Sequence, residues 1–256
     1  MCASVASRRN FTEISVWRRR WMWARLPSME LPQKESLADA AYRHLKRLIL
    51  SATLSPDTVI DEKLVAAELG MSRTPVRQAT SRLAAEGFVR VLPQRGTLVA
   101  QLSVSDIEQV YLLRSLVEPV AASLAAQRAT PQDLERLEAF EREYLAEFDI
   151  EDHIPDHALH TRLHTAIAEV AGMPRLVRLI RELQEQTQWF LAVRVREGRQ
   201  VPSPHSHQTL LSAIRDGDAE RARDISRTAI LGSRSKILNG AVPEADLLLA
   251  TATTLP

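Results

Sequence analysis

The order of predicted elements between residues 61 and 100 constrains the fold more than any other feature of this sequence. Asp61 begins a short helix that Gly70 ends, and only a short turn follows before Ser72 begins a second helix that reaches residue 86. Two short helices joined by a Gly-containing turn are typical of a helix-turn-helix. The spacing of these residues therefore predicts a helix-turn-helix in this part of the chain.

A β-hairpin is expected directly after the second helix. Residues 88–92 and 97–100 are β-prone, and the turn Pro93-Gln-Arg-Gly96 lies between them. A further helix beginning at Ser36 precedes the helix-turn-helix. We therefore predict a winged helix-turn-helix, made of three helices and a β-hairpin wing, over residues 36–102.

Helical periodicity replaces the strand signal after residue 102. Ser105 and Glu108 are expected to form a capping box at the start of a helix that ends near Arg128, and Thr130 caps the next helix. Gly and Pro residues separate further helices, expected over residues 156–171, 174–196, 203–216 and 218–238. The chain is therefore predicted to be mainly α, with an all-α antiparallel helical bundle over residues 103–240 after the winged helix-turn-helix.

The two ends of the chain are expected to lie outside these two domains. Residues 1–35 are rich in arginine and lack the apolar core and cleavage site of a signal peptide, so we expect a basic, disordered extension. Residues 241–256 are expected to form a flexible tail. Two interpretations of the extension stay open: it contacts DNA phosphates, or translation starts at Met29 rather than at Met1.

Charge is unevenly distributed along the chain, although the formal net charge is only +1. Residues 1–102 contain 16 Lys and Arg against 9 Asp and Glu, whereas the remainder contains 17 against 23. A basic front half indicates a polyanionic partner, although uneven scatter of surface charge would give the same numbers. The single cysteine, Cys2, fits a reducing cytoplasm, and the lack of a run of about 20 apolar residues indicates no membrane partner.

The second helix of the predicted helix-turn-helix carries residues suited to reading DNA. Residues 72–77 read Ser-Arg-Thr-Pro-Val-Arg, so Arg73 and Arg77 lie one turn apart on one face. An arginine can bind O6 and N7 of guanine with two hydrogen bonds, and the hydroxyls of Ser72 and Thr74 can bind phosphates or bases. A capped surface helix with solvated arginines is the alternative. Because helix, turn, basic cap and wing occur in order, we favour double-stranded DNA as the partner.

Three further residues are expected to contact DNA. Lys63 lies on the preceding helix, where it can meet the backbone of the duplex. Arg95 and Gly96 lie at the tip of the predicted wing, where an arginine can enter the minor groove and a glycine lets the backbone approach closely. The wing is therefore expected to add contacts to those of the second helix.

Distinctive strings of residues occur in two parts of the chain. Between Ala41 and Val99 they are Leu64, Leu69-Gly70-Met71-Ser72-Arg73-Thr74-Pro75-Val76-Arg77, Arg82-Leu83, Glu86-Gly87-Phe88-Val89 and Gly96. This run resembles the winged-helix domain of the GntR family of bacterial regulators. Between residues 103 and 240 they are Leu113-Arg114, Leu116, Glu118-Pro119, Leu163-His164, Ala171-Gly172, Pro174-Arg175-Leu176, His207, Ala213-Ile214 and Gly217-Asp218. This second part is similar to the FCD domain, the helical ligand domain of the FadR subfamily.

The resemblance implies a set of DNA contacts and a mode of assembly. The contacts would come from Lys63, Ser72, Arg73, Thr74, Arg77, Arg95 and Gly96. The assembly would be a homodimer on a two-fold-related operator, with a small effector sensed by the C-terminal domain. Physical reasoning agrees, because one short helix makes few contacts and two heads one helical turn apart read a palindrome. A repressor that an inducer releases is the commoner arrangement in this family.

Histidines in the C-terminal half indicate a metal site. His160 and His164 are four residues apart in a predicted helix, a spacing common in pairs that chelate zinc or another divalent metal. His207 begins a different helix, which a bundle can bring alongside. The FCD pattern implies an Asp and three His as ligands, of which the Asp falls at His160 and the last His at Ala229. Three imidazoles would leave coordination positions that a ligand carboxylate can fill.

Three interpretations of the histidines stay open: a three-His metal site, a metal-free pocket lined by the histidines and Arg114, and surface histidines near a loop. Arg114 is expected to face the bundle, where a buried arginine needs an anion. That anion is either the carboxylate of a bound ligand or the side chain of Glu118.

These features predict a transcription regulator, acting as a repressor, whose affinity for its operator is controlled by a small organic acid bound in the C-terminal domain. Two alternatives stay open. A metal-dependent hydrolase would need a general base beside the histidine pair, and residues 160–164 lack the internal Glu of the metalloprotease motif. A constitutive DNA-binding protein with a degenerate sensor is the other, because Ala229 cannot bind a metal. No catalytic residue is assigned, and we expect no enzyme.

Overall fold

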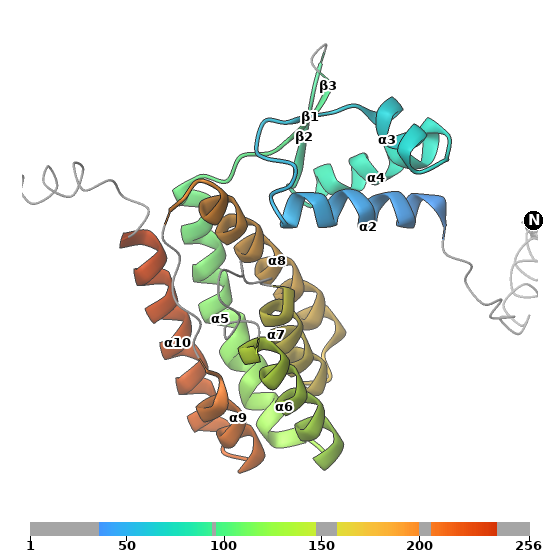
Figure 1. Cartoon of the computed structure of the whole chain (residues 1–256). Coiled ribbons are helices and arrows are strands. Elements are labelled where there is room, and N and C mark those ends of the chain that lie inside the picture. Colours follow the sequence, from blue (N-terminus) through green and yellow to red (C-terminus); the bar gives the residue numbers. More distant parts are fainter. Residues whose placement is uncertain (1–35, 94–95, 147–157, 200–205, 240–256) are drawn as a thin grey trace, which may run out of the picture. The chain divides into compact units, whose positions relative to one another are not determined.

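The computed structural model describes residues 36–93, 96–146, 158–199 and 206–239 (Figure 1). The predicted N-terminal extension, the C-terminal tail and the wing-tip residue Arg95 lie outside the described residues. The described part is mainly helical, with a small sheet near its N-terminal end and an all-helical C-terminal domain. The predicted fold class is thus confirmed.

The N-terminal elements form a winged helix-turn-helix. They are α2 (Leu37–Leu50), β1 (Val59–Ile60), α3 (Glu62–Glu68), α4 (Arg73–Ala85), β2 (Val89–Leu92) and β3 (Gly96–Val99). β2 and β3 pair antiparallel as the predicted hairpin, and β1 adds a third antiparallel strand in the order β1-β3-β2. The two residues of β1 are too few to give an alternating pattern, so the sequence did not predict this strand.

One apolar cluster holds these elements together. Leu45 and Ile49 of α2, Leu83 of α4 and Phe88 beside β2 are fully buried in it. Val76 is also fully buried, so α4 turns one face to this cluster and leaves its polar face to solvent. The packing of α4 therefore decides which of its side chains can reach a partner.

Gly87 ends α4 in a conformation that glycine adopts most easily. Its φ is +82°, its N–H donates to the carbonyl of Ala84, and the N–H of Phe88 donates to the carbonyl of Leu83. These two bonds form the Schellman arrangement that closes many helices. A Cβ at this position would meet nothing within 4 Å, so any cost of a side chain comes from the backbone conformation.

Two glycine substitutions should therefore change stability in opposite directions. We expect Gly87→Ala to lower the free energy of unfolding by about 1–2 kcal/mol, because alanine strains the left-handed conformation. Gly232→Ala, inside α10 with open space around its Cβ, should raise it by about 0.5–1 kcal/mol. Urea denaturation followed by circular dichroism measures both. Equal effects of the two substitutions would contradict this reasoning.

The C-terminal domain is a bundle of antiparallel helices (Figure 1). They are α5 (Val104–Arg128), α6 (Pro131–Ala146), α7 (Ala158–Val170), α8 (Pro174–Arg196), α9 (Gln208–Arg215) and α10 (Ala219–Asn239). α5 packs against α7, α8, α9 and α10, so it forms the centre of the bundle. None of the described helices combines the length and hydropathy needed to cross a membrane.

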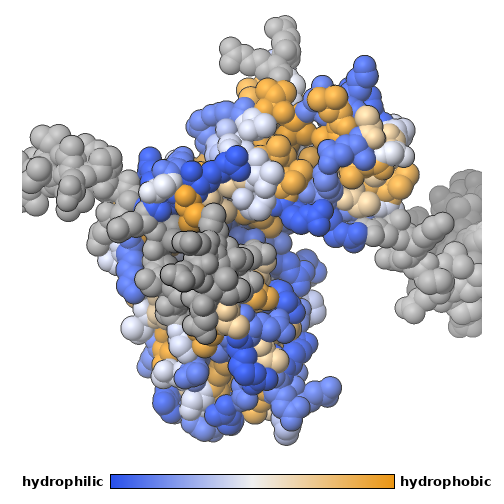
Figure 2. Space-filling model, viewed as in Figure 1, coloured by the Kyte–Doolittle hydropathy of each residue, from blue (hydrophilic) through white to orange (hydrophobic). Residues whose placement is uncertain are grey.

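The bundle's visible surface is largely hydrophilic (Figure 2).

The start of α5 differs from the expected one. Ser103 caps the helix, and its side chain and that of Asp106 bond each other's backbone N–H in a capping box. The prediction of Ser105 and Glu108 as this box was therefore wrong by two residues. Both pairs have the same spacing, and the structure selects the pair nearer β3.

Candidate functional site

The residues predicted to read DNA lie at the exposed N-terminal end of α4. Ser72 is the N-cap residue, and its side chain makes no capping hydrogen bond. The side chain of Arg73 is 69% exposed, and Thr74 and Arg77 are exposed as well. Since Val76 is buried between them, the two arginines project away from the core. This arrangement can present two guanidinium groups to a ligand.

A hydrogen bond joins the two helices of the helix-turn-helix. The Thr80 hydroxyl of α4 donates to Oε1 of Glu62 in α3 at 2.9 Å. Oε2 of Glu62 lies 3.9 Å from the Arg73 guanidinium, a long contact that leaves this side chain accessible. Lys63 is the next residue of α3 and is exposed. The carboxylate of Glu62 thus links α3 to α4 and leaves the side chains of Arg73 and Lys63 exposed.

The wing contributes one described residue to the predicted contacts. Gly96 is the first residue of β3, is exposed and has a φ of +86°. A Cβ here would meet nothing within 4 Å, so a neighbouring molecule can approach the backbone closely. Arg95 lies outside the described residues and stays a prediction.

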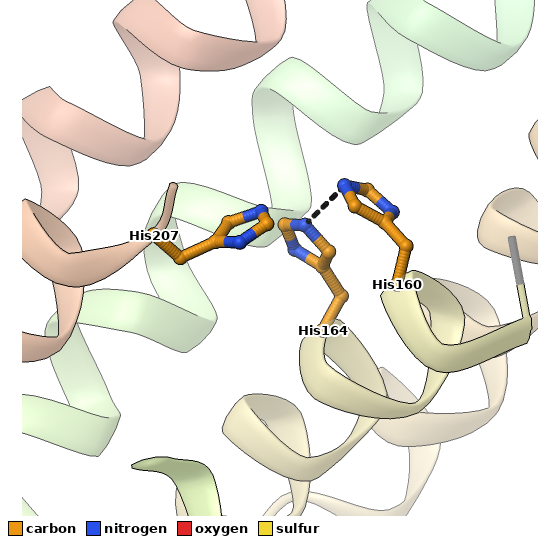
Figure 3. Close-up of side chains that lie close together, drawn as sticks. All are labelled: His160, His164 and His207. Carbon is orange, nitrogen blue, oxygen red and sulfur yellow. Dashed lines mark hydrogen bonds between the residues drawn. The ribbon is translucent and has the colours of Figure 1, made fainter. Parts of the chain in front are cut away.

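Three histidines converge in the C-terminal domain (Figure 3). His160 and His164 project from one face of α7, and their Nε2 atoms are 3.2 Å apart. His207 comes from the N-terminal end of α9, and its ring centroid lies 5.1 Å from each of the other two. One ligand atom from each residue lies within 4.8 Å of the others. The bundle therefore brings together the two sequence-distant parts of the predicted site.

Buried carboxylates contact the Nδ1 atoms of two of these histidines. Oε2 of Glu118 lies 3.0 Å from Nδ1 of His164, and Oε2 of Glu141 lies 2.8 Å from Nδ1 of His207. Oε1 of Glu141 also accepts from the backbone N–H of His207 at 2.6 Å. A carboxylate on Nδ1 fixes the ring orientation and leaves Nε2 as the metal-binding atom. Pairs of this kind are typical of histidines that bind metals.

The burial of His164 favours its metal-binding form. Burial lowers the pKa of His164, although Glu118 acts in the opposite direction, so the imidazole is neutral at neutral pH. Burial alone would raise the pKa of Glu118, but Arg114 and His164 lower it to about 2. Glu118 is therefore a carboxylate under all physiological conditions. A neutral imidazole held by a carboxylate is the state that a divalent metal requires.

Arg114 is buried and paired inside the protein. Its Nε donates to Oε1 of Glu118 at 2.6 Å, and its Nη1 donates to the Thr187 hydroxyl at 3.2 Å. Of the two anions left open by the sequence, the structure supplies Glu118. The side chain of Arg114 also lines a cavity beside the histidines. Its role in clamping the carboxylate of a ligand therefore stays a prediction.

This cavity has a volume of about 430 Å³. Its lining includes Arg114, His164 and His207, together with residues of α10, among them Ala229. The methyl group of Ala229 thus occupies the position where the family resemblance implies a fourth ligand. A small ligand in the cavity can reach His164, His207 and this position.

Glu141 is a residue of the site that the sequence did not reveal. It follows Leu137 by four residues on α6 and precedes Tyr144 by three, and all three are buried. A charged residue at a core position of an amphipathic helix is a signal that could have pointed to it.

Comparisons with known proteins match both parts of the chain. Residues 37–99 match the family of bacterial regulatory proteins called gntR, and residues 109–231 match the FCD domain. The HTH-type transcriptional repressor RspR of Escherichia coli is 30% identical over 196 residues, which are 71% of this chain and 81% of that protein. An uncharacterized HTH-type regulator of Agrobacterium vitis is 39% identical over 92 residues, and the chain spans 54% of its length.

Solved structures share the fold. The structure of E. coli McbR/YncC has a TM-score of 0.68 at 24% identity, and the match covers 80% of this chain and 98% of that one. The relatives matched over most of their length are transcription regulators and not enzymes. The chain therefore belongs to the GntR family of bacterial regulatory proteins, and it is an HTH-type DNA-binding transcription regulator with a C-terminal FCD domain.

Proposed function

We propose that this protein is a repressor that binds a two-fold-related operator as a homodimer and responds to a small organic acid. The DNA-binding domain would span residues 36–102, and the effector-binding and dimerisation domain residues 103–240. The cavity lined by His164, His207 and Arg114 carries the proposal. It offers a small ligand a cationic neighbour and access to the cluster that these two histidines form with His160. Such a protein would work in the cytoplasm, on the nucleoid.

The metal in this proposal is a divalent ion such as zinc, bound by His160, His164 and His207. Three imidazole nitrogens suit zinc and similar ions better than hard cations, which prefer oxygen ligands. Three protein ligands leave a zinc ion with an open position, as in sites that bind substrates. Because Ala229 provides no ligand, a carboxylate of the effector would complete the coordination.

An exposed apolar face on α5 supports the proposed homodimer. Leu112, Leu116 and Val120 recur every four residues along the helix and are 58%, 59% and 40% exposed, and Leu113 beside them is 44% exposed. A contiguous apolar stripe of this kind marks an interaction site rather than an ordinary surface. A second copy is the partner that we commit to, since a two-fold-related operator requires two heads.

Charges placed in this stripe should separate the proposed dimer. We expect Leu112→Glu with Leu116→Glu to weaken self-association at least about tenfold, because unpaired carboxylates would be buried in the interface. Sedimentation velocity at several protein concentrations measures the effect. Met173→Glu, which changes a 43% exposed side chain at the N-cap of α8, is the control and should leave association unchanged. A double variant that dimerises like the wild type would contradict the proposed interface.

The regulatory proposal is tested by a gel shift on DNA that flanks the protein's own gene. We expect retardation at moderate salt, and release of the DNA by one member of a panel of sugar acids, hydroxy acids and dicarboxylates. Only an acid that binds the DNA-bound and the DNA-free state of the protein with different affinity can shift the equilibrium between them. Retardation that no acid or metal alters would instead favour the constitutive DNA-binding protein.

A further inference from the structure

Residues 184–189 of α8, a segment of slightly less than two helical turns that we call the α8 turn, contact the buried residues Glu118 and Arg114 next to the histidines. Gln184 donates to Oε1 of Glu118 at 2.9 Å, and Thr187 accepts from Arg114 at 3.2 Å. The next residue, Gln188, accepts from the Thr161 hydroxyl on α7 at 3.2 Å. The side chains of Gln184, Thr187 and Gln188 are all buried. The α8 turn is therefore bonded to the same carboxylate that holds His164.

The α8 turn also contacts the winged helix-turn-helix. Glu185 lies 2.7 Å from the ammonium group of Lys46 in α2, and Lys46 lies 2.8 Å from Glu86, the C-cap residue of α4. Trp189 is 1% exposed and belongs to the apolar cluster of the N-terminal elements. Its ring centroid lies 5.5 Å from that of Phe88. Adjacent residues of the α8 turn thus bind the histidine site and the end of the DNA-reading helix.

We propose that residues 184–189 of α8 couple the histidine site to the DNA-binding head within one protomer, with Glu118 as the positioning residue at one end and Lys46 at the other. This inference rests on the proposed function, since it assigns a regulatory path to the same site. A helical turn is rigid over a few residues, so a movement of Glu118 that follows the loading of His164 is passed to Gln184 and, on the next residues, to Glu185 and Trp189.

Trp189 provides a direct readout of this coupling. The chain has four tryptophans, and the other three, Trp17, Trp21 and Trp23, lie outside the described residues. Replacing these three with phenylalanine makes Trp189 the only indole of the full chain. We expect its fluorescence emission to change as zinc is added and to saturate together with zinc binding, which competition with a chromophoric chelator measures separately.

Two variants in this background test the path. Gln184→Leu with Thr187→Val removes the hydrogen bonds to Glu118 and Arg114 and keeps the side-chain volumes similar. This double variant should still bind zinc, but the zinc-induced change in Trp189 emission should be about fivefold smaller. Glu182→Gln, an exposed change on the same helix, should keep the full amplitude. Zinc binding without an emission change in the parent, or an undiminished signal in the double variant, would overturn the coupling.

A second experiment judges the coupling without any metal. Glu118→Gln should speed amide hydrogen exchange in residues 42–50 of α2 by about fivefold relative to the parent, whereas Glu182→Gln should not. Unchanged exchange there would overturn the proposed path. A protein that binds no zinc but shows the exchange effect would refute the metal site and support the coupling, so the two failures are distinguishable.

Discussion

Replacing Arg73 and Arg77 together with alanine is expected to weaken specific operator binding about a thousandfold, since each arginine that binds a guanine contributes about 1–3 kcal/mol. Both side chains are exposed at the N-terminal end of α4, so their removal should leave the fold intact. Fluorescence anisotropy with a labelled operator duplex at one fixed salt concentration measures the loss. The melting temperature, followed by circular dichroism, should stay that of the wild type.

A control of equal charge separates base reading from general attraction to DNA. Arg142 on α6 and Arg178 on α8 are exposed, and Arg142→Ala with Arg178→Ala removes the same net charge. We expect this variant to bind the operator nearly as tightly as the wild type, because both residues belong to the C-terminal bundle and not to the winged helix-turn-helix. Equal losses in the two double variants would show that the α4 arginines act only through the overall charge.

The second large effect is expected at the histidine site. His164→Ala or His207→Ala should lower zinc affinity at least about a hundredfold, because each removes one of three ligands together with its contact to a buried carboxylate. Glu141→Gln keeps all three imidazoles and should cost about ten- to a hundredfold through the orientation of His207. Metal content of the purified protein and chelator competition provide the two measurements.

A histidine outside the cluster serves as the control for this series. His44 lies on α2 beside Glu68, and His44→Ala should leave zinc binding unchanged. Zinc affinity that survives the loss of His164 and of His207 would show that the metal position lies elsewhere. A loss in His207→Ala without one in Glu141→Gln would contradict the positioning role of Glu141 alone.

Local signals in the sequence predicted most of the fold. The glycine at position 87 and the proline at position 174 mark helix ends that the structure reproduces, and α8 spans residues 174–196 as expected. The start of α5 was misplaced because Ser103 and Ser105 each have an acidic residue three positions later. The local sequence does not distinguish between two such equivalent caps. Local patterns therefore predict the elements better than their ends.

The histidine site was only half visible in the sequence. The pair His160 and His164 follows from helical spacing, and His207 was added by family resemblance together with the expectation of a bundle. Glu141 belongs to a third helix and meets His207 only after α6 and α9 have packed together. Helical periodicity says which face of a helix is buried, but it does not say which residues of other helices meet that face.

Selection of duplexes from a random-sequence library by the full-length protein tests the central claim most directly. We expect an enriched inverted repeat, with half-sites about one helical turn apart, that the wild type retains and the variant with Arg73→Ala and Arg77→Ala does not. Enrichment of sequences without two-fold symmetry, or equal retention by the variant, would contradict a dimer that reads its operator through the start of α4.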